Sequence, residues 1–181
     1  ANCVVEQARE VDLIIASQVD PEGTNGVEID FAEQVVMQSG RPTLVVPMVG
    51  KFDTVGQRVV VGWNATREST RAVFDAVPLM KKSKKVWLVW IDPQNQMDLL
   101  SELPGTEIAT ALARHQINAE AEGLPTDHLG AGEALLNRVS DHGADLLVVG
   151  AYGHSRMREF VFGGATRTIL QQMTVPVLLS H

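Results

Sequence analysis

Apolar runs of strand length recur along the chain, and each is bounded by polar residues, glycine or proline. The runs are continuous in Val, Ile and Leu, which is the pattern of strands buried on both faces of a parallel sheet. Helical periodicity fills the gaps between them, so the sequence predicts an α/β doubly wound sheet. Strands are expected at 12–17, 43–48, 58–63, 85–91, 145–151 and 175–180, with a more polar edge strand at 118–123.

The two ends of the chain resemble each other. Residues 32–46 match residues 166–180 at an offset of 134, and Asp12 with its three following residues matches 145–148 at an offset of 133. The matched Asp, helix and Pro favour duplication over the coincidence of two ordinary strand–helix–strand pieces. We therefore expect the C-terminal part of a first unit at 1–48, a linker at 49–57 and a complete second unit at 58–181.

A first unit with only two strands leaves about half of its core uncovered. We therefore expect the sequence to be part of a longer tandem protein of about 300 residues, a size extrapolated from one further half-unit. The strands at 43–48 and 175–180 are apolar on both faces. If either had an unpaired edge, that edge would be prone to pair with another chain and aggregate. We expect them to pair antiparallel with each other, in one chain or between two copies, and we expect a homodimer.

Composition narrows the choice of partners. The 181 residues carry a formal charge of −7, which argues against a nucleic-acid or membrane-surface binder. The single cysteine excludes an internal disulfide framework and a thiolate zinc cluster. No stretch approaches the roughly 18–20 apolar residues of a membrane span. We expect a cytoplasmic protein with no structural metal.

Most motifs of catalysis are absent from the sequence. It has no GxxxxGK[ST] loop, no HExxH and no GxSxG, and the G-x-G at 130–132 fits the start of a helix better than a dinucleotide fingerprint. The five histidines show no metal-ligand spacing and are predicted to be solvated. Trp87 and Trp90 are predicted to pack in the core or an interface. The chain is not expected to be an enzyme.

One pattern does suggest a ligand. Gly150 and Gly153 follow a buried strand, and Gly163 and Gly164 open a helix that carries Thr166. Glycines after a strand let the backbone approach a ligand closely, and the first N–H groups of a helix suit phosphate. From the glycines alone, two ordinary turns framing a loop explain the pattern equally well.

The spacing G-x2-G-x9-G before a small hydroxyl residue resembles the phosphate-binding signature of the universal stress protein family. The stretches 59–72, 143–150 and 175–179 also resemble that family's opening, fourth and closing strands. The resemblance implies a five-stranded parallel sheet in the order 3-2-1-4-5, the adenine-nucleotide alpha-hydrolase-like fold. It also implies ATP or another adenine nucleotide, with Mg²⁺, as ligand. The implied binding residues are Trp63, Asn64, Ala65, Thr66, Gly150, Gly153, His154, Gly163, Gly164, Ala165 and Thr166.

The chain departs from the family pattern at two of these positions. Asn64 stands where the family has Asp, which keeps hydrogen-bonding capacity but loses the charge. Gly164 stands where the family has Ser, so one hydroxyl donor to phosphate is lost, worth about 1.5–3 kcal/mol. We expect a stress-responsive protein that binds an adenine nucleotide in its second unit. The alternative is a family member that has lost nucleotide binding and acts through its protein–protein surfaces.

Overall fold

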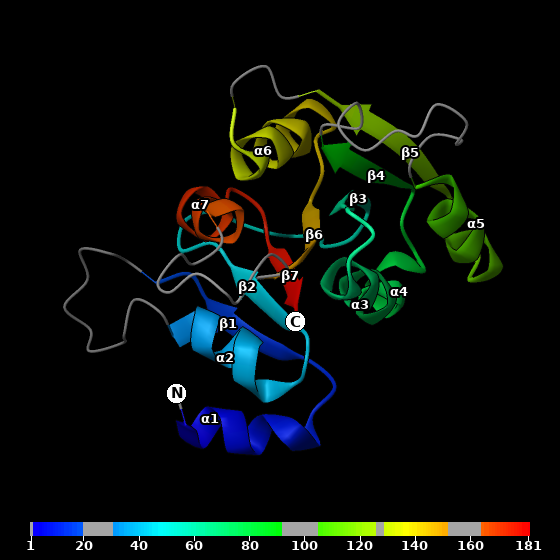
Figure 1. Cartoon of the computed structure of the whole chain (residues 1–181). Helices are drawn as coiled ribbons and strands as arrows, with labels where there is room; N and C mark the ends of the chain where they lie inside the picture. Colours follow the sequence, from blue (N-terminus) through cyan, green and yellow to red (C-terminus); the bar gives the residue numbers. More distant parts are fainter. Residues whose placement is uncertain (1, 20–30, 92–104, 126–128, 152–163) are drawn as a thin grey trace.

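The computed structural model describes residues 2–19, 31–91, 105–125, 129–151 and 164–181 (Figure 1). The strands are β1 (Ile14–Ser17), β2 (Thr43–Val46), β3 (Arg58–Gly62), β4 (Lys85–Ile91), β5 (Ala119–Leu124), β6 (Leu146–Gly150) and β7 (Val177–Ser180). The helices are α1 (Asn2–Gln7), α2 (Phe31–Ser39), α3 (Arg67–Asp75), α4 (Val77–Met80), α5 (Thr106–Arg114), α6 (Ala131–Asp141) and α7 (Gly164–Gln172), with a 3-10 turn at Ala8–Glu10. Every strand expected from the sequence is present, most of them slightly shorter than predicted.

All seven strands form one sheet in the order β1-β2-β7-β6-β3-β4-β5. Neighbouring strands are parallel except β2 and β7, which are antiparallel. Within the second unit the order β5-β4-β3-β6-β7 is the 3-2-1-4-5 order that the family resemblance implied, and that expectation is confirmed. The α/β fold class is confirmed as well, with seven strands in one continuous sheet.

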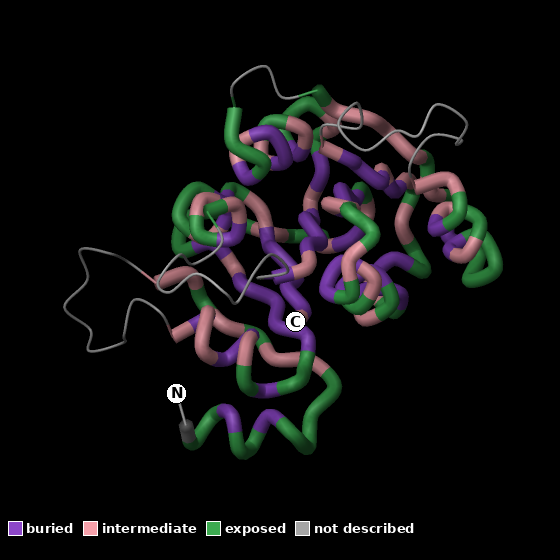
Figure 2. The backbone as a smooth tube through the Cα atoms, in the orientation of Figure 1, coloured by how far each residue is buried: buried purple, intermediate pink, exposed green. Residues whose placement is uncertain are grey.

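Helices cover both faces of the sheet, and the strands between them are the most deeply buried part of the chain (Figure 2). The helices α3, α4 and α5 pack on one face, through residues such as Val73, Met80 and Leu112. The other face is covered by α2, α6 and α7, through residues such as Val36, Leu135 and Ile169. Burial on both faces explains why the strand sequences are continuously apolar.

The internal resemblance extends to strand register. Ile14 of β1 pairs with Thr43 of β2, and at the matching positions Leu147 of β6 pairs with Val177 of β7. The segments β1–α2–β2 and β6–α7–β7 therefore have the same strand pairing. We call them the first and the second repeat.

The expected antiparallel pairing joins the two repeats inside one chain. Leu44 of β2 pairs with Leu178 of β7, and these two leucines occupy matching positions at the offset of 134. They therefore mark the centre of the local twofold relation between the repeats. Because β2 lies between β1 and β7, and β7 between β2 and β6, neither strand has a free edge in this chain. The homodimer through these strands stays a prediction.

One prediction about the histidines is wrong for His142. Its ring stacks on Trp87 with centroids 4.1 Å apart and planes at 5°, and its Nε2 lies 2.9 Å from a carboxylate oxygen of Glu122. The guanidinium carbon of Arg58 lies over the Trp87 ring, 5.2 Å from its centroid, and Arg58 Nε donates a hydrogen bond of 2.7 Å to the carbonyl of His142. The side chain is partly buried because β3, β4 and β5 bring partners that are distant in sequence.

Asp145 fixes the segment that we predicted as a linker. Its carboxylate accepts hydrogen bonds from the Thr54 hydroxyl at 2.8 Å and from the backbone N–H groups of Gly56, Gln57 and Arg58 at 2.9–3.1 Å. Residues 54–58 are therefore held against the start of β6.

In the described part of the chain, no helix is long and apolar enough to cross a lipid bilayer.

Candidate functional site

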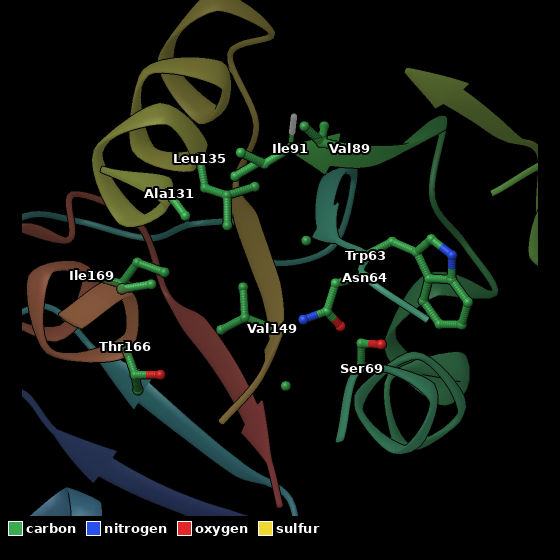
Figure 3. Close-up of a pocket in the computed structure, with 13 residues that line it drawn as sticks. Trp63, Asn64, Ser69, Val89, Ile91, Ala131, Leu135, Val149, Thr166 and Ile169 are labelled. Carbon is green, nitrogen blue, oxygen red and sulfur yellow. The ribbon is translucent and has the colours of Figure 1, made fainter. Parts of the chain in front are cut away.

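A cavity of about 140 Å³ lies at the carboxyl ends of β3 and β6 (Figure 3). In an open α/β sheet this is the topological switch point, because the chain continues from β3 to β4 on one side while β6 lies on the other. The lining residues are Gly62, Trp63, Asn64, Ser69, Val89, Ile91, Ala131, Leu135, Val149, Gly150, Ala165, Thr166 and Ile169. A largely apolar hollow with a few convergent polar groups has the character of a small-molecule site.

The loop after β3 is organised by a helix cap. The Thr66 hydroxyl accepts a hydrogen bond from the backbone N–H of Ser69 at 3.3 Å, and the Ser69 hydroxyl accepts one from the N–H of Thr66 at 3.1 Å. This reciprocal capping box fixes the start of α3. The side-chain oxygen of Asn64 accepts from the N–H and the hydroxyl of Thr66, at 3.3 and 2.9 Å. The turn needs a positive φ of 54° at Ala65, which is unusual for a residue with a Cβ.

Gly150 is needed for a reason that the sequence did not reveal. A Cβ at this position would lie 2.4 Å from the backbone nitrogen of Ser69 and 2.5 Å from the carbonyl carbon of Glu68. The missing side chain therefore makes room for the first turn of α3 against the end of β6. We expected this glycine to admit a ligand, whereas the close neighbour is the protein's own backbone.

Glu68 is buried in this first turn, with 8% of its surface exposed. Burial by itself would raise the pKa of its carboxyl group. A hydrogen bond from its own backbone N–H, the polar side chain of Thr66 and the charge of Arg67 together outweigh burial and lower the pKa below its ordinary value. The carboxylate is therefore ionised at neutral pH and lies at the positive end of α3, where a negative charge is favourable.

The opposite wall of the cavity is the start of α7. Ala165 and Thr166 line the cavity, and Thr166 is 5% exposed. The Thr166 side chain faces the cavity in Figure 3. The first N–H groups of α7 also lie on this side. A hydroxyl beside the start of a helix, where the first N–H groups have no partner within the helix, suits an anionic group.

The structure brings most of the described candidate residues together. Trp63, Asn64, Gly150, Ala165 and Thr166 line the cavity, whereas Ala65 and Gly164 stand beside it in the loop after β3 and at the start of α7. The indole of Trp63 turns away from the other lining side chains and packs against the core on the α3 face. Gly153, His154 and Gly163 lie outside the described residues.

Neither the apolar lining of the cavity nor Ser69 was among the residues predicted from the sequence. Ser69 is three residues beyond the predicted loop, and its place in the capping box was the available signal. The apolar side chains come from four different elements, and no local pattern distinguishes them from ordinary core residues: Val89, Ile91, Leu135, Val149 and Ile169. Within the described residues, no group of three or more His, Cys, Asp or Glu side chains could hold a metal ion.

This strand order, with a cavity between the carboxyl ends of β3 and β6, defines an open α/β sheet of the doubly wound class. Residues 56–181 match the sequence profile of the universal stress protein family. The chain belongs to the universal stress protein family.

Individual relatives agree with this assignment. The curated universal stress protein Slr1230 from Synechocystis is 26% identical over 187 aligned positions, covering 98% of this chain and 60% of the relative. The chain therefore spans less than two thirds of the length of that relative.

Solved structures show the same fold. A universal stress protein from Archaeoglobus fulgidus DSM 4304 aligns with 99% of this chain and 64% of its own length, at a TM-score of 0.74 and 14% identity. Another universal stress protein structure from Archaeoglobus fulgidus aligns with 68% of this chain and 97% of its own length, at a TM-score of 0.55 and 15% identity.

Proposed function

We propose that the chain binds ATP or a related adenine nucleotide, with Mg²⁺ accompanying the phosphates, in the cavity between β3, β6 and α7. Family membership supports a stress-related role, and the nucleotide would be the signal or effector in that role. We propose binding rather than catalysis, because the described residues around the cavity offer no activated nucleophile. The finding that carries the proposal is the position of Thr166 at the start of α7, where its side chain lines the cavity opposite the loop after β3.

The arrangement of the cavity fits the two ends of a nucleotide. The N–H groups of α7 and the Thr166 hydroxyl suit phosphate oxygens, because a helix start combines unpaired donors with the positive end of its dipole. The apolar side chains of Val89, Ile91 and Leu135 suit the flat face of a base.

We also propose the tandem arrangement. The shared register of the two repeats supports it, as does the contrast between relatives of one-unit and longer length. Residues 58–181 would form the complete unit and residues 1–48 the C-terminal part of another. A cytoplasmic location and a homodimer remain predictions.

The test is a binding titration with matched substitutions. Thr166→Val keeps the size of the side chain but removes its hydroxyl, so we expect calorimetry to show roughly 10-fold weaker binding of ATP or more. Ala32 occupies the matching place in the first repeat, so Ala32→Ser is the control and should leave ATP affinity unchanged. If ATP, ADP and AMP all fail to bind the native chain, the proposal is wrong, and the family member that acts through protein surfaces becomes the better description.

A further inference from the structure

The side chain of Gln18 joins the first repeat to the end of α7. Its amide nitrogen Nε2 donates hydrogen bonds to the backbone carbonyls of Leu170 and Gln171, at 2.8 and 3.2 Å. Its oxygen Oε1 accepts a hydrogen bond from the backbone N–H of Met48 at 3.1 Å. Gln18 follows β1 directly and Met48 lies shortly after β2, so this side chain ties α7 to the ends of both strands of the first repeat.

The hydrogen bonds from Gln18 cap the carboxyl end of a helix. The last four carbonyls of an α-helix have no partners within the helix, and α7 ends at Gln172. Gln18 satisfies two of them from 152 and 153 positions away in the chain. The matching residue of the second repeat, at an offset of 133, is Ala151, which has no side-chain donor. The cap therefore belongs to one repeat and is not part of the twofold relation.

The opposite end of α7 forms a wall of the candidate site. Ala165, Thr166 and Ile169 line the cavity, and Figure 3 shows the side chains of Thr166 and Ile169 on this wall. The first turn of α7 packs closely on α6, since a Cβ at Gly132 would lie 2.7 Å from the carbonyl oxygen of Ala165. If its last turn were released, α7 would pivot about this contact. The N–H groups of the first turn point along the helix axis, so a tilt changes the angle of their hydrogen bonds to a ligand.

The side of α7 that faces the first repeat is not tightly packed. A second cavity, of about 160 Å³, lies beside Gln18 between the first repeat and α7. Its walls include Val45 of β2 and Leu170 of α7. Close packing would hold a helix in place by itself, whereas a cavity leaves it room to move. The hydrogen bonds from Gln18 therefore restrict a tilt that packing alone permits.

We propose that Gln18 is a positioning residue for the nucleotide site: by capping α7 it holds the start of this helix where the phosphates bind, so the first repeat strengthens nucleotide binding by the second. This inference rests on the proposed nucleotide function. Coupling between two contacts is reciprocal, so a bound nucleotide tightens the contact between α7 and the first repeat by the same factor.

Gln18→Glu keeps the shape of the side chain and reverses the character of one end. The carboxylate still accepts from the Met48 N–H, but its other oxygen faces two carbonyls at the negative end of the helix dipole. At pH 7.5 we expect calorimetry to show roughly 5-fold weaker ATP binding or more. The loss should shrink as the pH is lowered toward 5, since a protonated carboxyl group again donates, whereas acid does not reverse a general loss of stability. The native chain, which shares the charged Glu33 and Arg167 beside this contact, is the reference at each pH.

Two further variants separate this role from other effects of the substitution. Gln18→Ala removes the cap without adding a charge, so it should weaken ATP binding less than Gln18→Glu and show no recovery at low pH. Arg41→Ala removes a different side-chain hydrogen bond of the first repeat, 3.0 Å long, to the carbonyl of Arg9. It should bind ATP like the native chain. Thermal melts show whether each variant is folded.

Amide hydrogen exchange followed by NMR tests the reciprocal effect. The N–H of Met48 bonds to Gln18 and reports this contact directly. In the native chain, saturating ATP should slow the exchange of this amide by about the factor that Gln18→Glu costs in affinity. In Gln18→Ala, ATP should leave its exchange unchanged.

The possible outcomes separate this inference from the proposed function. Unchanged ATP affinity in Gln18→Glu, or an equal loss in Arg41→Ala, overturns the positioning role and leaves nucleotide binding intact. If Gln18→Glu does not fold, native affinity in Gln18→Ala overturns it in the same way. Failure of every nucleotide to bind the native chain overturns the proposed function, and this inference with it.

Discussion

The two repeats share a register but differ in their surroundings. In the second repeat β6 lies inside the sheet, between β3 and β7, whereas in the first repeat β1 is at the edge and pairs with β2 alone. At matching positions, Val148 of β6 is fully buried and Ile15 of β1 is 68% exposed. Similar apolar strand sequences therefore lie in opposite environments. The apolar pattern predicts that a strand forms, but the strands and helices packed beside it determine how far it is buried.

The features that form the cavity belong to the second repeat. Gly150 allows α3 to pack against the end of β6, and the matching residue of the first repeat is Ser17, on an exposed edge. Thr166 presents its hydroxyl to the cavity, and the matching residue is Ala32, which has no hydroxyl. A shared fold therefore does not give a shared site, because the site depends on a few side chains.

The largest expected effect comes from introducing a charge at the matched strand positions. Val148→Asp places a carboxylate in the core with no partner, and we expect it to destabilise the fold by about 3 kcal/mol or more, enough to prevent folding. Ile15→Asp should change the free energy of unfolding by about 0.5 kcal/mol at most, because the side chain is mostly in water. Urea denaturation followed by circular dichroism measures both. Equal effects would contradict the comparison.

Restoring the hydroxyl at Gly164 should strengthen the site in the second repeat. Among the described residues, a Cβ at this position meets no atom within 4 Å, so none of them obstructs Gly164→Ser. A recovered hydrogen bond to phosphate of about 1.5–3 kcal/mol corresponds to roughly 10- to 150-fold tighter ATP binding. Gly164→Ala adds the Cβ without the hydroxyl and should bind like the native chain. If the alanine variant binds as tightly as the serine variant, the hydroxyl is not the cause.

Exchanging the residues at positions 17 and 150 tests why the repeats differ there. Gly150→Ser forces α3 away from β6 and should destabilise the chain by about 1–3 kcal/mol. Ser17→Gly lies on an exposed edge and should cost about 1 kcal/mol at most, from backbone entropy. Thermal unfolding measures both changes. A larger loss for Ser17→Gly than for Gly150→Ser would be inconsistent with the close approach of α3.

Glu68 makes the α3–β6 contact sensitive to acid. Its pKa in the folded chain lies below the ordinary value of 4.5, so its contribution to stability is present above that pH and is lost as the pH falls through the lower folded value. Glu68→Gln should lose part of the stability at pH 7 and show a flatter decline between pH 5 and pH 3. Urea midpoints measured across this range provide the comparison. Parallel pH curves for the two proteins would show that Glu68 contributes nothing to the decline.

The smallest expected effect is at Ala65. Its φ of 54° costs about 1–2 kcal/mol in a residue with a Cβ, and glycine relieves this at the expense of about 0.4–1 kcal/mol of unfolded-state entropy. We expect Ala65→Gly to stabilise the chain by about 0.5 kcal/mol. Ala111→Gly, inside α5, is the control and should destabilise by about 1 kcal/mol. Calorimetric melting temperatures that fall for both variants would show that the turn at Ala65 is not strained.

Local patterns predicted the elements of the fold well, because continuous apolar runs and helical periodicity are properties of neighbouring residues. The strand order came from the family resemblance, and the pairing of β2 with β7 from the duplicated edge strands. The reason for Gly150, the four hydrogen bonds to Asp145 and the stacking of His142 on Trp87 could not be predicted, since each joins segments that are distant in sequence. The orientation of Asn64 is local, but it depends on which atoms of Thr66 face it.

The pairing of Leu44 with Leu178 brings together two residues that are 134 positions apart in the chain. The entropy cost of closing a loop grows only with the logarithm of its length. Contacts between segments so distant in sequence nevertheless form slowly. We therefore expect the first repeat to add to a sheet that the second unit has built, with the connecting chain supplying a high effective concentration of the partner strand. A single cut in the exposed stretch 49–53 would turn this step into the association of two separate fragments, which dilution can reverse.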